Sequence, residues 1–452
     1  MSFPHDFVWG AATSAFQIEG ATGEGGRGES IWDRFCATPG KIVDGTDGAV
    51  ACDHYHRFPE DIALMKELGL NAYRFSVAWP RIQPTGTGDP NAQGLDFYAR
   101  LIDGLLDAGI TPYVTLYHWD LPQALQDAGG WPERSICEKF ADYAAVFVGH
   151  FGDRVKHWMT FNEPWCISHL GYETGHQAPG WTDQAAALRA THHVFLSHGY
   201  AVPRIRELCP DGEVGLVLNL TPGYPASASS QDQGATDWFD GFFNRWYLDP
   251  VFGRGYPQDM LEHYSTTGGV SGTEPDFIHD GDMERIATEI DVLGVNYYSR
   301  AILRGHEEGN LPRELHDVPG DEKTDMGWEV FPEGLEALLV RLQEDYAPKT
   351  IMITENGVAY GDGPDASGRI QDTRRIEFLR GHLQACERAL HRGVTLTGFF
   401  AWSLMDNFEW AHGYRMRFGL LWVDYETLER KPKDSFYWYR DAIAANGIRE
   451  SL

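Results

Sequence analysis

The chain alternates short apolar runs with segments whose apolar residues recur at helical spacing, and this alternation limits the folds that it can adopt. The apolar runs predict eight strands, at residues 7–13, 71–77, 110–118, 156–163, 213–220, 290–298, 349–355 and 394–402. The segments between them predict helices at residues 58–69, 95–109, 136–151, 184–208, 282–288, 333–344 and 373–392. Nearly continuous apolar strands separated by helices are typical of a parallel sheet covered by helices.

Eight strand–helix units predict a closed (β/α)8 barrel, the TIM barrel of the α/β class. An open, doubly wound parallel sheet is the alternative, but its nucleotide-binding fingerprint is matched poorly. Residues 23–28 read G-x-G-x-x-G, yet they lie well past the first strand and open no helix. A nicotinamide-dependent oxidoreductase would rest on this match alone.

Domain organisation follows from the same pattern. A length of 452 residues by itself suggests more than one domain, although barrels are a common exception. No Pro/Gly/Ser-rich linker divides the chain, and the long polar loop at 305–325 lies inside the strand–helix pattern. We therefore expect one catalytic domain that spans residues 1–452.

Polar or aromatic residues stand at the carboxyl ends of nearly all the predicted strands. In a barrel these ends form one rim, where the active sites of such proteins lie. Packing inside the barrel does not require polar residues there, so the pattern predicts a functional site. The residues in question are Gln17, Arg74, His118, Asn162, Glu163, Asn219, Asn296, Tyr298, Glu355 and Trp402.

Charge and composition exclude several classes of partner. A formal net charge of −29 argues against nucleic acid and anionic membranes, because both require a basic surface. The first residues lack a basic and apolar secretion signal, and no window approaches a membrane span, so we expect a cytoplasmic protein. The six cysteines form no CxxC pair and are expected to be reduced. No cofactor is expected, and no metal, because the paired histidines lack zinc-site spacing: His54, His56, His192 and His193.

Aromatic residues make up 13% of the chain and include 15 tryptophans. Several tryptophans adjoin polar residues, as in Trp119-Asp120, Trp402-Ser403 and Glu409-Trp410. This pairing suits a ligand with apolar faces and a rim of hydroxyl groups, and sugars are such ligands.

Two glutamates, Glu163 and Glu355, end predicted strands on opposite sides of the barrel mouth. Hydrolysis of a glycosidic bond requires such a pair, with one carboxyl group protonated and the other ionised. Arg74 and the Tyr298 hydroxyl are expected to favour the ionised form of one of them. The sequence therefore predicts a glycosidase site.

The motifs around these glutamates resemble the two signatures of the family 1 glycoside hydrolases, the β-glucosidase family. They read Thr160-Phe-Asn-Glu-Pro164 and Ile353-Thr-Glu-Asn-Gly357. Further matches occur in order along the chain, at residues 7–13, 73–76, 118–119, 296–298, 407–410, 413–414 and 417–419. The resemblance implies a (β/α)8 barrel that hydrolyses β-glycosides with retention of anomeric configuration.

The resemblance also implies roles for individual residues. Glu163 would be the general acid/base and Glu355 the nucleophile, with Arg74 and Tyr298 orienting Glu355. The sugar hydroxyls would be bound by Gln17, His118, Asn162, Glu409 and Trp410, with Asn296 in support, and the sugar ring would stack on Trp402. Trp328 would carry the leaving group, and Trp119 and Phe418 are expected to contact the substrate as well.

Substrate and mechanism remain expectations at this stage. Retention requires carboxyl groups about 5–5.5 Å apart, whereas about 6.5–9.5 Å would indicate inversion. Glu409 would repel a phosphate, so we expect unphosphorylated glucosides and, more weakly, fucosides and galactosides. A non-catalytic sugar-binding barrel is the rival from another class, but such a protein would have lost one of the two glutamates. The aglycone and the oligomeric state stay open.

Overall fold

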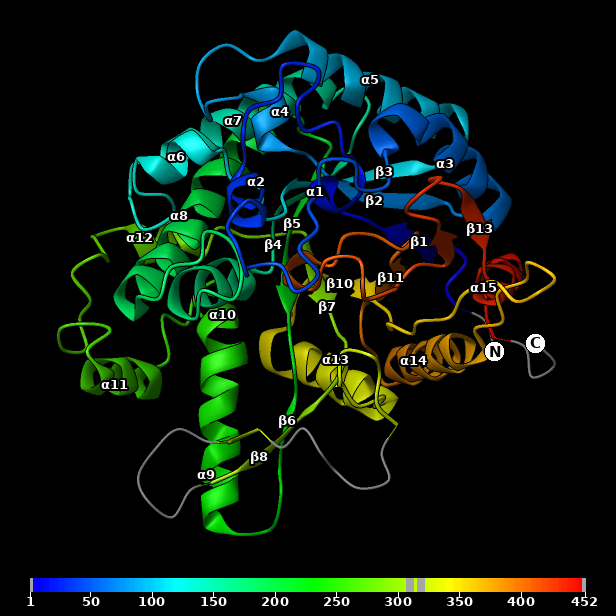
Figure 1. Ribbon diagram of the computed structural model, residues 1–452. Coiled ribbons are helices and arrows are strands. Elements are labelled where there is room, and N and C mark those ends of the chain that lie inside the picture. The colour runs from blue at the N-terminus through cyan, green and yellow to red at the C-terminus, as the bar shows by residue number, and fades with distance from the viewer. Residues whose placement is uncertain (1–2, 306–312, 315–321, 449–452) are drawn as a thin grey trace.

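The computed structural model describes residues 3–305, 313–314 and 322–448. Within these residues eight parallel strands form a closed barrel in the order β1-β11-β10-β7-β5-β4-β3-β2. Helices surround this barrel in Figure 1. The predicted (β/α)8 barrel is confirmed, and the open doubly wound sheet is excluded. Most of the predicted polar loop at 305–325 lies outside the described residues.

All eight predicted strands are present in the barrel. They are β1 (Val8–Ala12), β2 (Ala72–Ser76), β3 (Thr111–Tyr117), β4 (His157–Asn162), β5 (Glu213–Asn219), β7 (Val292–Asn296), β10 (Thr350–Asn356) and β11 (Leu396–Trp402). The predicted helices are α3 (His54–Leu68), α5 (Ala92–Asp107), α7 (Ile136–Phe151), α8 (Gln184–Leu208), α12 (Asp282–Ile286), α13 (Pro332–Tyr346) and α14 (Thr373–His391). Helix α3 begins earlier than predicted, because Asp53 turns the chain into it with a left-handed φ of 53°.

The remaining elements were not predicted. The helices are α1 (Ala15–Ile18), α2 (Ile31–Cys36), α4 (Trp79–Ile82), α6 (Gln123–Asp127), α9 (Ser230–Phe239), α10 (Trp246–Leu248), α11 (Gln258–Thr267) and α15 (Asp434–Ala445). Two π-helical segments, η1 (Cys166–Glu173) and η2 (Asp240–Arg245), and the 3-10 helix η3 (Trp410–His412) complete the helical elements. Small sheets pair β6 (Gly223–Pro225), β8 (Ala301–Arg304) and β9 (Arg313–Glu314), and β12 (Leu421–Val423) with β13 (Arg430–Pro432). The glycines of residues 23–28 lie in the loop between α1 and α2.

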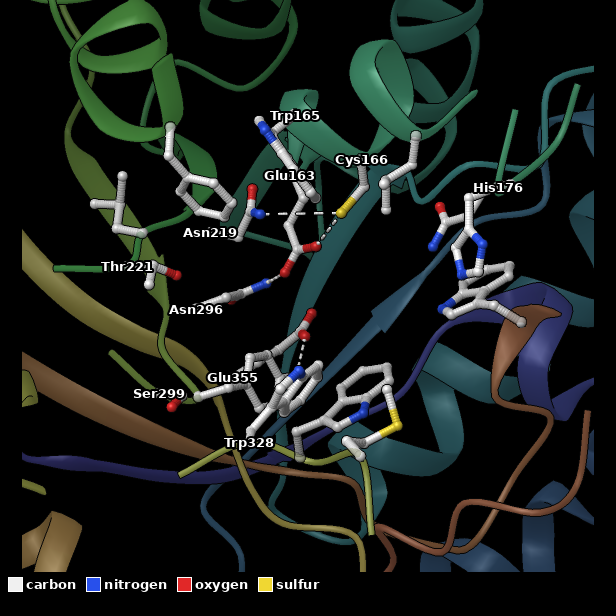
Figure 2. Close-up of a pocket in the computed structure, with 18 of the residues that line it drawn as sticks. Glu163, Trp165, Cys166, His176, Asn219, Thr221, Asn296, Ser299, Trp328 and Glu355 are labelled. Carbon is white, nitrogen blue, oxygen red and sulfur yellow. Dashed lines mark hydrogen bonds between the residues drawn. The ribbon is translucent and has the colours of Figure 1, made fainter. Parts of the chain in front are cut away.

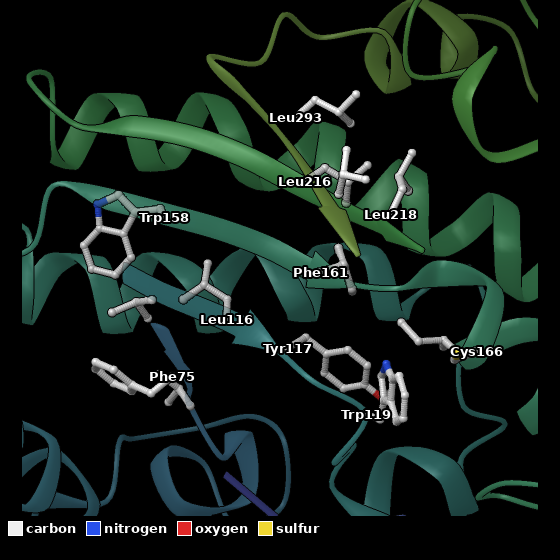
Figure 3. Close-up of a cluster of buried hydrophobic side chains, with 14 of the residues drawn as sticks. Phe75, Leu116, Tyr117, Trp119, Trp158, Phe161, Cys166, Leu216, Leu218 and Leu293 are labelled. Carbon is white, nitrogen blue, oxygen red and sulfur yellow. The ribbon is translucent and has the colours of Figure 1, made fainter. Parts of the chain in front are cut away.

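Alternate residues of each barrel strand face two different cores. In β10, Ile351 and Ile353 belong to the large cluster between the strands and the helices, whereas Met352 belongs to a smaller cluster inside the barrel. Figure 3 shows part of the outer cluster, with Trp158 and Leu216 projecting from neighbouring strands. Because side chains alternate along a strand, the inward residues near the carboxyl ends are the ones that reach the barrel mouth.

Three further features bear on the sequence predictions. The six cysteines are free thiols. In the described part of the chain, no helix is long and apolar enough to span a membrane. The same residues contain no group of three or more His, Cys, Asp and Glu side chains that could hold a metal ion.

Candidate active site

Both glutamates singled out in the sequence follow a break in strand register. The pairing of β10 with β7 shifts between Ile353 and Glu355, and the pairing of β4 with β5 shifts between Met159 and Asn162. A strict two-residue alternation would place Glu355 on the helix-facing side with Ile351 and Ile353. The irregularity turns Glu355 toward the barrel mouth instead, as β-bulges beside active sites do.

Glu163 follows β4 in a left-handed backbone conformation, with a φ of 50°. Its N–H donates to the Val217 carbonyl of β5 at 2.9 Å, and its own carbonyl accepts from the N–H of Cys166 at 3.0 Å. Positive φ at a non-glycine residue costs about 1–3 kcal/mol, which the surrounding contacts must offset. The result is a carboxyl group that lies at the mouth while the residue stays 6% exposed.

Two donors hold the carboxyl group of Glu355. Arg74 Nη1 donates to Oε1 at 2.7 Å, and the Tyr298 hydroxyl donates to Oε2 at 2.7 Å. The same guanidinium donates to Asn162 Oδ1 at 2.7 Å and to the Thr354 carbonyl at 3.1 Å. Arg74 therefore stabilises the Glu355 carboxylate and joins β2, β4 and β10 at the level of the two glutamates.

Glu163 is held differently. Asn296 Nδ2 donates to Oε1 at 2.6 Å, and Cys166 Sγ donates to Oε2 at 3.0 Å; both contacts are drawn in Figure 2. Among the described residues Glu163 has no ion-pair partner. Its donors are an amide and a thiol, which stabilise an anion less than a guanidinium does.

The proton affinities of the two carboxyl groups follow from these contacts. Burial and the nearby Glu355 carboxylate raise the pKa of Glu163 to about 7. Burial raises the pKa of Glu355 as well, but Arg74 and Tyr298 oppose that rise. Glu163 is therefore the carboxyl group that keeps a proton toward neutral pH, and Glu355 is the one whose anion has charged and hydroxyl partners.

A third carboxyl group, that of Glu409, lies in the same cavity. Burial, together with repulsion from Glu355 and Glu163, raises its pKa to about 8. Gln17 Nε2 lies 3.4 Å from Glu409 Oε2 and also donates to the Phe408 carbonyl at 2.8 Å. Gln17 thus positions the segment that carries Glu409.

The cavity at the barrel mouth has a volume of about 490 Å³ and brings most of the predicted residues together. Three of them do not line it: Gln17, Arg74 and Asn162 are buried next to it and contact the lining residues Glu409, Glu355 and His118. The predicted residues that line it are His118, Trp119, Glu163, Asn296, Tyr298, Trp328, Glu355, Trp402, Glu409, Trp410 and Phe418.

His118 contacts both the aromatic side chains of the cavity and the hydrogen-bonded side chain of Asn162. Its ring lies 5.9 Å from the rings of Trp402 and Trp410, nearly parallel to both. Burial lowers its pKa well below the usual value, so the imidazole is neutral. Asn162 Nδ2 contacts its Nε2 at 3.0 Å, and its Nδ1 has no partner among the described residues. Because the amide donates to Nε2, Nδ1 carries the hydrogen.

The sequence did not single out several residues of the outer cavity. Trp165 and Cys166 come shortly after Glu163 in the chain, beyond Pro164, and Phe242 and Phe243 come from η2. Phe243 packs on Trp165 with ring centroids 4.6 Å apart. The one signal for this wall is the density of aromatic residues between charged ones in residues 237–245.

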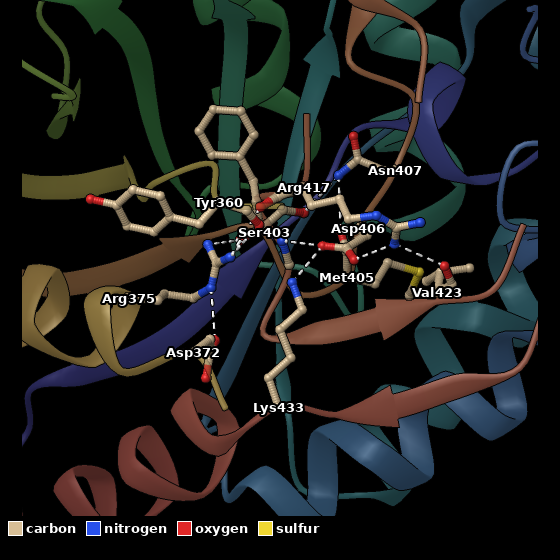
Figure 4. Close-up of polar contacts among 12 residues, drawn as sticks. Tyr360, Asp372, Arg375, Ser403, Met405, Asp406, Asn407, Arg417, Val423 and Lys433 are labelled. Atoms are coloured by element: carbon tan, nitrogen blue, oxygen red, sulfur yellow. Dashed lines mark hydrogen bonds and ion pairs between the residues drawn. The ribbon is translucent and has the colours of Figure 1, made fainter. Parts of the chain in front are cut away.

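A buried charge network supports the chain after β11, which carries Glu409, Trp410 and Phe418. Asp406 accepts from Lys433 Nζ at 2.8 Å and from Arg417 Nη1 at 2.7 Å, as Figure 4 shows. Asp406 and Lys433 are fully buried. Burial lowers the pKa of Lys433 to about 8, although Asp406 opposes this change. The network therefore holds residues 403–420 against the barrel.

Comparison with known proteins agrees with this geometry. The family model for glycosyl hydrolase family 1 matches residues 1–448. The chain belongs to glycosyl hydrolase family 1. It is therefore a glycosidase, as the sequence predicted. Two similar relatives are β-glucosidase A of Acetivibrio thermocellus, 48% identical over 99% of both chains, and β-glucosidase A of Thermotoga maritima, 45% identical over 99% of both.

The fold of this family member is likewise similar to solved structures. The β-glucosidase from Thermotoga maritima in complex with glucoimidazole superposes with a TM-score of 0.94 at 44% identity, covering 99% of this chain and 100% of that one. The AHE enzyme from Alicyclobacillus herbarius has a TM-score of 0.94 at 48% identity, covering 98% and 99% of the two chains.

Removing the charge of Asp406 is expected to destabilise the protein. The substitution Asp406→Asn keeps the shape but leaves Lys433 buried without its counter-charge, so the free energy of unfolding falls by about 3 kcal/mol. Asp96→Asn is the control, because it breaks an exposed pair with Arg100 in α5 and should cost less than about 1 kcal/mol. Denaturant unfolding of the three proteins measures both changes. Equal losses in the two variants would contradict a structural role for the network.

Proposed function

We propose that this protein is a retaining β-glucosidase with one catalytic domain spanning residues 1–452. It hydrolyses terminal, non-reducing β-D-glucosyl residues of cello-oligosaccharides or aryl β-glucosides. The observation that carries the proposal is the unequal environment of Glu163 and Glu355 in one cavity, because burial favours a proton on the first while Arg74 pairs with the second. One protonated and one ionised carboxyl group are what glycoside hydrolysis requires.

In the first step, a carboxylate oxygen of Glu355 attacks the anomeric carbon and the bond to the leaving oxygen breaks. Glu163 gives its proton to that oxygen, so the aglycone departs as a neutral alcohol or phenol. Arg74 and Tyr298 orient the Glu355 carboxylate for attack, since each donates to a different oxygen of it. The product of this step is a glucosyl ester of Glu355.

In the second step, the ionised Glu163 takes a proton from water and the oxygen of that water attacks the anomeric carbon. The ester bond to Glu355 breaks, and glucose leaves with the β configuration of the substrate. The two displacements at the same carbon account for retention. Asn296 donates to Glu163 Oε1 and keeps the carboxyl group in place for both steps.

Glucose recognition is assigned to the inner wall of the cavity. Trp402 offers a ring face to the sugar. The hydroxyl groups are assigned to the polar side chains at or directly behind this wall, which are Gln17, His118, Asn162, Glu409 and Trp410. The relative from Thermotoga maritima has been solved in complex with glucoimidazole, which supports a sugar-sized ligand at this position. Trp328 and Phe418, whose rings lie 6.3 Å apart, are assigned to the leaving-group side.

Unphosphorylated sugars are the proposed substrates. Glu409 presents a carboxyl group where a phosphate would need a cation. Arg417, which follows in the same loop, is paired with Asp406 at 2.7 Å and also donates to the Val423 carbonyl at 3.0 Å. It is therefore committed to the loop and unavailable to a 6-phosphate.

Product stereochemistry tests the retaining mechanism. Proton NMR during hydrolysis of p-nitrophenyl β-glucoside should show β-glucose first, with α-glucose arising later by mutarotation. An initial α-anomer would contradict the double displacement.

The products formed with azide distinguish the roles of the two carboxyl groups. With 2,4-dinitrophenyl β-glucoside, Glu163→Ala should release β-glucosyl azide, because azide replaces water on the glycosyl-enzyme. Glu355→Ala should instead release α-glucosyl azide, because azide then replaces the nucleophile. Products of the opposite configuration would reverse the assigned roles.

The pH profile tests the proton on Glu163. Since its pKa is raised to about 7, the acid form persists well above the range of an ordinary glutamic acid and is lost as pH rises through that value. We expect kcat/KM for p-nitrophenyl β-glucoside to fall about tenfold per pH unit above this point. This decrease in kcat/KM should be smaller for 2,4-dinitrophenyl β-glucoside, because its leaving group needs little protonation. Identical limbs for both substrates would contradict the acid role.

Phosphorylated substrates test the role of Glu409. Above pH 8, where Glu409 is ionised, its repulsion of a 6-phosphate should lower kcat/KM by at least about 100-fold relative to the unphosphorylated p-nitrophenyl β-glucoside. Glu409→Gln is the control, because it removes the charge and should narrow that ratio. Comparable turnover of the two substrates by the unaltered enzyme would refute the assignment.

A further inference from the structure

The carboxyl group of Glu163 has a donor on each oxygen, and the second donor is a thiol. Asn296 occupies Oε1 at 2.6 Å, and Cys166 Sγ lies 3.0 Å from Oε2. Figure 2 shows the sulfur of Cys166 pointing at Glu163, with dashed contacts from this sulfur to both Glu163 and Asn219. Asn219 Nδ2 is 3.9 Å from the sulfur, which makes a three-member chain from Asn219 through Cys166 to Glu163.

The backbone holds Cys166 in this place. Cys166 is the first residue of η1, and its N–H donates to the carbonyl of Glu163 at 3.0 Å. This turn brings side chains three positions apart to the same side. Ser168 anchors the next part of η1, because its hydroxyl donates to the Pro164 carbonyl at 2.8 Å and contacts the Tyr247 hydroxyl at 3.1 Å. The thiol is also buried, so it cannot move into solvent.

The hydrogen-bond partners of the two carboxyl oxygens indicate which oxygen of Glu163 carries the proton. An amide NH₂ group can only donate, so Oε1 acts as an acceptor from Asn296. The carboxylic acid proton therefore resides on Oε2, the oxygen beside Cys166. A thiol is a weak donor and a weak acceptor whose hydrogen rotates about the C–S bond. It can donate to the carboxylate form of Glu163 and release Oε2 when that oxygen carries the proton.

We propose that Cys166 is a positioning residue for the general acid/base, and that its thiol fixes Oε2 of Glu163 and determines how firmly this oxygen holds its proton. The inference rests on the acid/base role assigned to Glu163 above. A weak donor suits a group that must give up a proton in one step and take one in the next. A stronger donor would favour the carboxylate, and an apolar neighbour would favour the acid.

Other groups facing Glu163 also affect its proton, and they stay constant when Cys166 is replaced. Glu355 raises the pKa of Glu163 and Arg74 lowers it. Glu409 and Tyr298 interact with the Glu163 charge from the far side of the cavity. The thiol itself remains protonated over the working range, because burial and the Glu163 charge raise the pKa of Cys166 well above its usual value.

Two substitutions at Cys166 predict shifts of opposite sign. Cys166→Ala removes the donor, so the basic limb of kcat/KM for p-nitrophenyl β-glucoside should move to higher pH by about half a unit. Cys166→Ser supplies a stronger hydroxyl donor, so the limb should move to lower pH by about the same amount. KM should change by less than about twofold in both, since the thiol is assigned no contact with the glucose.

Cys386→Ala is the matched control, because Cys386 is a buried free cysteine in α14 that does not line the cavity. Its limb should coincide with that of the unaltered enzyme. The inference would be overturned if the basic limb of the kcat/KM profile stayed fixed in both Cys166 variants, or moved in the same direction in both. This holds even if both variants lose activity or thermal stability. Glu163→Gln tests the acid/base role of Glu163 separately from the role of Cys166. If the basic limb of the kcat/KM profile persists in this variant, the role of Glu163 is overturned, and with it that of Cys166.

Discussion

The ion pair between Arg74 and one of the two buried glutamates, Glu163 and Glu355, sets the chemistry at the mouth of this barrel. Glu163, Glu355 and Glu409 share the cavity, and Arg74 makes its ion pair with Glu355. An uncompensated buried charge costs several kcal/mol, so the carboxyl groups without a cation keep their protons more readily. The position of Arg74 thereby separates the two glutamates chemically, although both stand at equivalent places on the barrel rim.

Hydrogen bonds in the rest of the site hold these charged groups in position. Asn296 contacts both Glu163 and Asn162, and Asn162 accepts from Arg74, so neutral amides connect the two sides of the mouth. These amides carry no net charge, and their hydrogen bonds fix the distances between the charged groups. On the open side, the loop after β11 is tied down by Asp406, which keeps Glu409 close enough to feel the other two carboxyl groups.

Much of the fold was predictable from the sequence, because barrel strands buried on both faces are almost continuously apolar. The direction of Glu355 was not, since strict alternation from Ile351 and Ile353 would turn it away from the cavity and only a register shift brings it in. The motif resemblance named the site residues, but it did not show that Gln17 is fully buried and hydrogen-bonded to the segment that carries Glu409. Cys166 gave no signal in the sequence, because its role depends on one turn of η1 that periodicity does not reveal.

In the proposed mechanism, Glu355 forms a covalent bond to the sugar while Glu163 moves the proton. Mass spectrometry after incubation with 2,4-dinitrophenyl 2-deoxy-2-fluoro-β-glucoside tests it most directly, because the fluorine slows breakdown of a glycosyl-enzyme more than its formation. The double displacement predicts a single fluoroglucosyl adduct on the peptide that contains Glu355. An adduct on the peptide that contains Glu163, or no adduct in an enzyme that still hydrolyses the ordinary glucoside, would contradict it.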